Sequence, residues 1–112
     1  MRNRRGLMTM ASLAFQDDRS VGRDEVHYRA KAFGQDAKPI ALVIVNMSAM
    51  GLMARCETHY QAGDRITINL PIVGAIVAHI RWSLGGRIGC ALDRTIDLAN
   101  YYELLAVMLR AR

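Results

Sequence analysis

The stretch RITINLPIVGAIVAHIRWSLGGRIGCAL, residues 65–92, decides the fold. In Arg65–Leu70 the isoleucines alternate with polar residues, which is typical of a strand with one buried face. The run Ile72–Trp82 is apolar and alternating, and we expect a second strand there. Leu84–Gly86 ends in two consecutive glycines and predicts a hairpin turn, after which Arg87–Leu92 returns antiparallel to the second strand.

The residues before this stretch keep the same period of two. Apolar and polar residues alternate over Val26–Ala32, and Gly34–Asp36 predicts a turn. An apolar, β-branched strand is expected at Pro39–Val45, followed by a loop at Asn46–Gly51 and a short strand at Leu52–Cys56. Six strands at intervals of roughly ten residues, joined by short turns, predict an all-β domain, a small antiparallel barrel or sandwich.

The end of the chain has a different period, which predicts one terminal α-helix. Thr95 or Asp97 is the candidate N-cap, and Arg110 and Arg112 lie near the negative end of the helix dipole. We expect this helix either to cap the barrel or to bury an apolar face in a partner. The apolar residues that recur at helical spacing are Leu98, Tyr101, Tyr102, Leu104, Leu105, Met108 and Leu109.

The composition favours one soluble domain with an anionic partner. The chain has 112 residues, of which 52% are hydrophobic, and a net charge of +5. Thirteen of its fifteen basic residues are arginines, whose planar donors match phosphates and guanine edges. We expect residues 1–15 to be a basic, disordered tail and residues 16–112 to form a single domain. No apolar run is long enough to span a membrane, and we expect a cytoplasmic protein.

No catalytic or metal-binding pattern is present in the sequence. Cys56 and Cys90 are too few for a disulfide scaffold and lack zinc-site spacing, so we expect buried, reduced thiols. The three histidines are far apart, and none lies in a metalloprotease pattern. Aromatic residues are also too few for a base-stacking platform that would bind DNA or RNA. We therefore expect neither an enzyme nor a metal or cofactor site.

Two short motifs point to a ligand. Arg19-Ser20-Val21-Gly22-Arg23 precedes the first strand, and Asn46-Met47-Ser48-Ala49-Met50-Gly51 forms the loop after the second. This pair resembles the double signature of the PilZ domain family, which binds the bacterial second messenger cyclic di-GMP. Gly63-Asp64, Ile80-Arg81-Trp82 and the Gly89–Leu92 strand also look like PilZ, and the resemblance runs from about Asp17 to the end of the chain.

The resemblance implies a six-stranded PilZ-type barrel with a C-terminal helix, and a site for cyclic di-GMP. The implied ligand-binding residues are Arg19, Arg23, Asn46, Ser48 and Gly51, with Trp82 as a further candidate. Guanidinium groups pair with phosphates or with the O6 and N7 atoms of guanine, and an asparagine amide can pair with a guanine edge. Binding is expected to change the arginine segment and the protein surface, which an unknown downstream protein would recognise.

Alternative interpretations of the same residues stay open at this stage. Ser48 could form only a local side-chain-to-backbone turn, and Gly51 could only mark a bulge. Arg19 and Arg23 have acidic neighbours that could neutralise them. Trp82 could stack on a base, or it could pack in the core or under the terminal helix. The alternative function is a PilZ-like adaptor that binds no nucleotide and acts through protein contacts.

Overall fold

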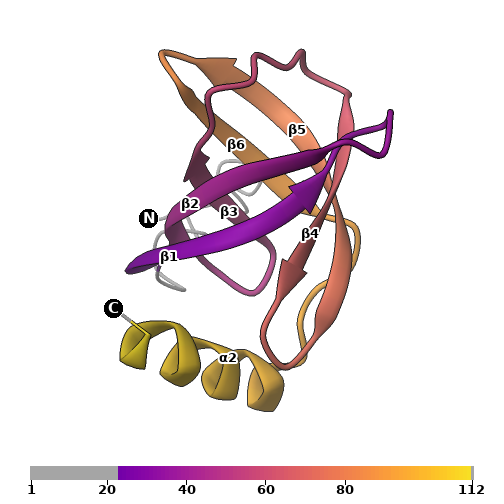
Figure 1. Cartoon of the computed structure of the whole chain (residues 1–112). Helices are drawn as coiled ribbons and strands as arrows, with labels where there is room; N and C mark the ends of the chain where they lie inside the picture. The colour runs from indigo at the N-terminus through magenta and orange to yellow at the C-terminus, as the bar shows by residue number, and fades with distance from the viewer. Residues whose placement is uncertain (1–22, 112) are drawn as a thin grey trace, which may run out of the picture.

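The expected six-stranded antiparallel barrel with one C-terminal helix is confirmed, and of the barrel and the sandwich that the strand pattern allowed, the structure has the barrel. The computed structural model describes residues 23–111, so the expectations for the N-terminal tail, Arg19 and Arg112 lie outside it. Six antiparallel strands close into a barrel in the order β1-β2-β3-β6-β5-β4, and one helix lies across its end (Figure 1). The elements are β1 (Asp24–Phe33), β2 (Pro39–Met47), β3 (Gly51–Arg55), β4 (Arg65–Leu70), β5 (Gly74–Leu84), β6 (Arg87–Leu92) and α2 (Leu98–Arg110).

The alternation read from the sequence produces the barrel interior. Successive side chains of a strand point to opposite faces, so every second residue enters the core. In β1 Val26, Ala30 and Ala32 are buried and Tyr28 is partly buried, and the intervening polar residues His27, Arg29 and Lys31 are exposed. The largest side chains that are almost fully buried within the strands are Leu42, Ile44, Met47, Ile66, Ile68, Ile80 and Ile88.

The strand expected at Ile72–Trp82 is shifted by two residues, because β5 runs from Gly74 to Leu84. The β4–β5 connection takes up the difference. Val73 donates its backbone N–H to the carbonyl oxygen of Pro71 at 2.6 Å, and Ile72 adopts a φ of 68°. Ile72 is therefore in the turn and half-exposed rather than in the strand.

The C-terminal helix packs on the barrel through one face. Asp97, rather than Thr95, is the N-cap, and its carboxylate accepts the N–H of Asn100 at 3.5 Å. Tyr101, Leu104 and Met108 are buried against the barrel. The expectation that the helix caps the barrel is thus confirmed. No helix within residues 23–111 has the length and hydrophobicity that a bilayer crossing requires.

A buried hydrogen-bond cluster fixes the helix to the first two strands. The hydroxyl of Tyr101 lies 2.6 Å from Asp24 Oδ2 and 3.1 Å from the carbonyl oxygen of Met47. Asp24 begins β1 and Met47 ends β2, and the two residues are cross-strand partners. The pKa of Tyr101 is raised above its ordinary value, mainly by burial and secondly by the hydrogen bond to Asp24. The helix therefore depends on the position of Asp24.

Candidate ligand-binding groove

One cross-strand row on the outside of the barrel organises the candidate site. The register pairs Asn46 with Met53, Met53 with Gly89 and Gly89 with Trp82, across β2, β3, β6 and β5. Trp82 lies over Gly89, and a Cβ atom at residue 89 would overlap the indole ring. The glycine thus lets the tryptophan lie flat along the sheet while 40% of the side chain stays exposed.

Irregular pairing turns extra side chains toward this row. The β5–β6 register passes from Ile80–Cys90 to Trp82–Gly89, so Arg81 has no cross-strand partner. Ile80 is buried, whereas both Arg81 and Trp82 are exposed. A bulge of this kind bends the strand and re-aims its side chains, and such bulges are common beside binding sites. The β2–β3 pairing has a similar shift between Ile44 and Asn46.

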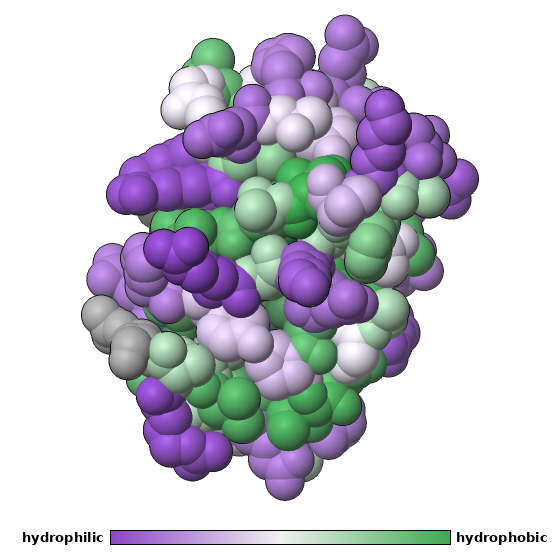
Figure 2. Space-filling model, viewed as in Figure 1, coloured by the Kyte–Doolittle hydropathy of each residue, from purple (hydrophilic) through white to green (hydrophobic). Residues whose placement is uncertain are grey.

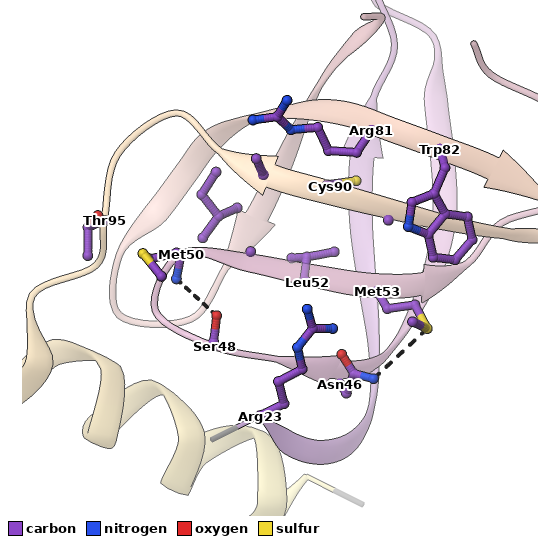
Figure 3. A pocket seen from close by; sticks show the side chains of 14 residues that line it. Arg23, Asn46, Ser48, Met50, Leu52, Met53, Arg81, Trp82, Cys90 and Thr95 are labelled. Carbon is purple, nitrogen blue, oxygen red and sulfur yellow. Dashed lines mark hydrogen bonds between the residues drawn. The ribbon is translucent and has the colours of Figure 1, made fainter. Parts of the chain in front are cut away.

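A groove with a volume of about 710 Å³ lies over this row (Figure 3). Arg23, the residue before β1, enters it from one side, and Arg81 lies along the opposite edge on β5. Trp82 and Met53 stand at one end, and Ser48, Met50 and Thr95 at the other. The complete lining is Arg23, Asn46, Ser48, Met50, Gly51, Leu52, Met53, Arg81, Trp82, Gly89, Cys90, Ala91, Leu92 and Thr95.

Five of the six site residues expected from the sequence lie within residues 23–111, and the structure brings these five together. Those residues, namely Arg23, Asn46, Ser48, Gly51 and Trp82, all line the groove. Arg19 lies outside the described residues. The second motif and the arginine that ends the first therefore meet at one place, although they are far apart in the sequence.

Asn46 has an unused acceptor in this groove. Its Oδ1 atom is buried and has no hydrogen-bond partner among residues 23–111, while its Nδ2 atom lies 3.9 Å from the sulfur of Met53. A buried polar atom without a partner costs about 1 to 3 kcal/mol of stability. A ligand that donates a hydrogen bond to Oδ1 would remove this cost.

Ser48 and Gly51 both have structural roles. Ser48 Oγ accepts the N–H of Met50 at 3.2 Å, and the Ser48 N–H donates to the carbonyl oxygen of Gly51 at 2.9 Å. The local turn considered for Ser48 is thus present. A Cβ atom at residue 51 would lie 2.6 Å from the carbonyl oxygen of Cys90, so the close approach of β6 requires glycine there.

Two further backbone contacts hold the motif loop against the end of β6. Leu92 donates its N–H to the carbonyl oxygen of Met50, and Ile96 donates to that of Ala49, both at 2.8 Å. The loop is therefore tied on both sides, by its own turn and by the segment that leads to α2. The floor of the groove is preformed by backbone contacts.

Of the two interpretations of Trp82, the buried one is wrong. Trp82 is an exposed side chain at the edge of the groove, outside the hydrophobic core. Stacking on a base stays a prediction. An indole face on the surface beside two arginines has the shape and chemistry that such stacking needs.

Sequence reasoning missed Arg81 and Cys90 as groove residues. The position of Arg81 directly before the only tryptophan could have identified it as a groove residue, but the orientation of its side chain depends on the bulge. The position of Cys90 on β6 follows from the barrel order. Burial raises the pKa of Cys90 to about 12, so its thiol is protonated and weakly reactive at neutral pH. Among residues 23–111 there is no group of three or more histidine, cysteine or acidic side chains that could hold a metal ion.

No protein-family model and no curated protein matches the chain. The geometry of the groove is therefore the basis for the function proposed below.

Proposed function

We propose that the chain is a cyclic di-GMP receptor of PilZ type and that the nucleotide binds in the groove. The observation that carries the proposal is the buried Oδ1 atom of Asn46, which has no partner among residues 23–111, in a groove that Arg23, Arg81 and an exposed tryptophan also line. A guanine offers N–H donors on its Watson–Crick edge, acceptors on its major-groove edge and a flat π face. These three features complement Asn46, the arginines and Trp82.

The charge and size of the groove support the same ligand. Arg23 and Arg81 form no ion pair with the acidic residues of the described range 23–111, and guanidinium groups at these positions suit phosphate or guanine acceptors. The volume of about 710 Å³ falls within the usual range of small-molecule sites. Arg19, which the resemblance adds to the site, would supply a further guanidinium.

Cyclic di-GMP would be bound without being altered. The one thiol in the groove, that of Cys90, keeps its proton at neutral pH because burial raises its pKa to about 12. Ser48 already accepts a backbone hydrogen bond from Met50. The described lining thus supplies positive charge, an amide and an aromatic face, which are the properties of a receptor.

A route for the signal starts at Arg23. Its chain neighbour Asp24 accepts the hydrogen bond of Tyr101, which anchors α2. A ligand phosphate that pairs with Arg23 in the groove and shifts its position would also shift this anchor and the surface around the helix. A downstream protein that recognises the helix and the adjoining strands would detect the change.

The second candidate is an adaptor that binds no nucleotide. The roles of Ser48 and Gly51 in holding the motif loop favour it, because the motif is explained in part without a ligand. The unpaired Asn46 acceptor favours the receptor instead. The two candidates differ in one measurable property, namely affinity for the nucleotide.

Isothermal titration of the full chain with cyclic di-GMP, with GMP and GTP as controls, tests the proposal. We expect saturable binding of cyclic di-GMP and much weaker binding of both controls. Trp82→Ala should weaken binding, whereas Arg65→Ala, which removes an exposed arginine that does not line the groove, should not. Absence of binding to the wild type would overturn the receptor and leave the adaptor.

A further inference from the structure

Helix α2 has a second apolar stripe, most of which is exposed, beside the face that packs on the barrel. Leu98 is 59% exposed, Tyr102 is 61% exposed and Leu109 is 42% exposed, while Leu105 is partly buried. Hydrophobic surface gathers along the lower edge of the molecule in Figure 2, where Figure 1 draws α2. Large exposed apolar side chains that form one continuous stripe mark an interaction surface.

The spacing of the stripe is that of a helix–helix interface. Residues 98, 102, 105 and 109 are separated by four, three and four positions, the spacing that keeps one seam facing a second helix. At about 100° per residue, this seam lies roughly a quarter-turn from the face that buries Tyr101, Leu104 and Met108. The barrel therefore covers one face of α2 and part of Leu105, and it leaves Leu98, Tyr102 and Leu109 accessible.

We propose that a second copy of this chain covers the seam, with the two α2 helices antiparallel about a two-fold axis. Antiparallel packing places Leu98 against the partner subunit's Leu109 and Tyr102 against the partner subunit's Leu105. Each layer then joins two large apolar side chains. Ala99 and Ala106 border the seam, and their small side chains let the helices approach closely.

Charge at the helix ends selects this orientation. Asp97 lies at the N-terminal end of α2 and Arg110 in its last turn. The ion pair found within residues 23–111 joins His79 to Asp93, so neither Asp97 nor Arg110 is paired there. Antiparallel packing brings the acidic end of one helix near the basic end of the other. A parallel pair would bring like charges together.

The length of the seam limits the affinity. Thirteen residues of α-helix span about 20 Å, so two such helices bury less surface than a typical stable interface of about 1,600 Å². We expect a dimer that dissociates in the micromolar range. This inference does not depend on what the groove binds.

Analytical ultracentrifugation of the full chain from about 1 to 500 μM tests the dimer. We expect the mass to rise with concentration from 12.5 kDa toward twice that value. Tyr102→Asp should raise the dissociation constant by at least tenfold. The matched control is Asn100→Asp, which adds the same charge at an exposed position off the seam and should leave it unchanged.

Cross-linking tests the orientation. A mixture of Leu98→Cys and Leu109→Cys chains should form a disulfide-linked dimer, whereas each variant alone should not, because the ends of an antiparallel seam meet opposite ends. A chain that stays at 12.5 kDa at every concentration would overturn the proposal. It would do so also if residues 1–22, rather than a second copy, cover the seam. Dimerisation that Tyr102→Asp leaves intact would overturn it as well.

Discussion

The inner and outer faces of the same strands follow different rules. One cross-strand row points inward and consists of Ile44, Ala54 and Ile88, all fully buried. The adjacent outward row runs through Asn46, Met53, Gly89 and Trp82 and contains an unpaired acceptor and a half-exposed indole. Packing explains the inner row completely. The outer row contains one buried acceptor, Asn46 Oδ1, that packing within residues 23–111 leaves without a partner, and the proposed ligand would supply one.

The largest expected effect is on the inner face. Ile80 is 1% exposed, so Ile80→Ala should lower the free energy of unfolding by about 2 to 5 kcal/mol through lost burial and a cavity. Its neighbour Arg81 is exposed, and Arg81→Ala should change stability by less than about 0.5 kcal/mol. Urea denaturation measures both. Equal losses would contradict the separation of the two faces.

The next effect is on the outer face. Arg23→Ala and Arg81→Ala should each weaken cyclic di-GMP binding by roughly 2 to 5 kcal/mol, because a neutral side chain cannot replace a charge-assisted contact. The same loss is expected for Arg19→Ala. Calorimetry gives the affinities, and thermal unfolding should show that the fold is intact. Wild-type affinity in any one variant would remove that arginine from the site.

A substitution at Asn46 should change stability and nucleotide binding in opposite directions. Asn46→Leu removes a buried acceptor that has no partner within residues 23–111, so it should raise stability by about 1 kcal/mol while it weakens nucleotide binding. Ser48→Ala should weaken binding less, because one hydroxyl contact is worth about 0.5 to 1.5 kcal/mol. It should also lower stability, because Ser48 Oγ accepts the Met50 N–H. A larger binding loss for Ser48→Ala would mean that Asn46 holds the loop.

The two faces were also unequally predictable. The alternation of Ile66 and Ile68 with polar residues needs no knowledge of the partner strands, so the strands were predicted from local periodicity. Periodicity alone allowed a barrel or a sandwich, and the resemblance to PilZ domains favoured the barrel. The motif loop was located because its residues are consecutive. The position of Arg81 in the groove could not be foreseen, because it depends on how β5 pairs with β6. Likewise, Tyr101 and Asp24 are 77 positions apart, and their hydrogen bond exists only once α2 has docked.

The link between the groove and the helix can be tested at that hydrogen bond. Tyr101→Phe removes the hydroxyl that Asp24 and Met47 share, and should lower the free energy of unfolding by about 1 to 2 kcal/mol. Nucleotide affinity should change little, because Tyr101 does not line the groove. Ligand-induced protection of α2 in hydrogen exchange should decrease in the variant. Unchanged protection would place the signal route elsewhere.

The smallest expected effect concerns pH. Burial raises the pKa of Cys90 from 9.0 to about 12, so the folded thiol keeps its proton where the unfolded thiol loses it. The contribution of this group to stability is present below pH 9 and is lost as the pH rises toward 12. Cys90→Ala should therefore make the decline of stability across this range shallower than in the wild type. Urea denaturation at pH 8, 9.5 and 11 measures the two slopes.

Because Cys90 lines the groove yet is protonated, iodoacetamide at pH 8 should modify it only after unfolding, and rapid modification of the native chain would contradict its burial.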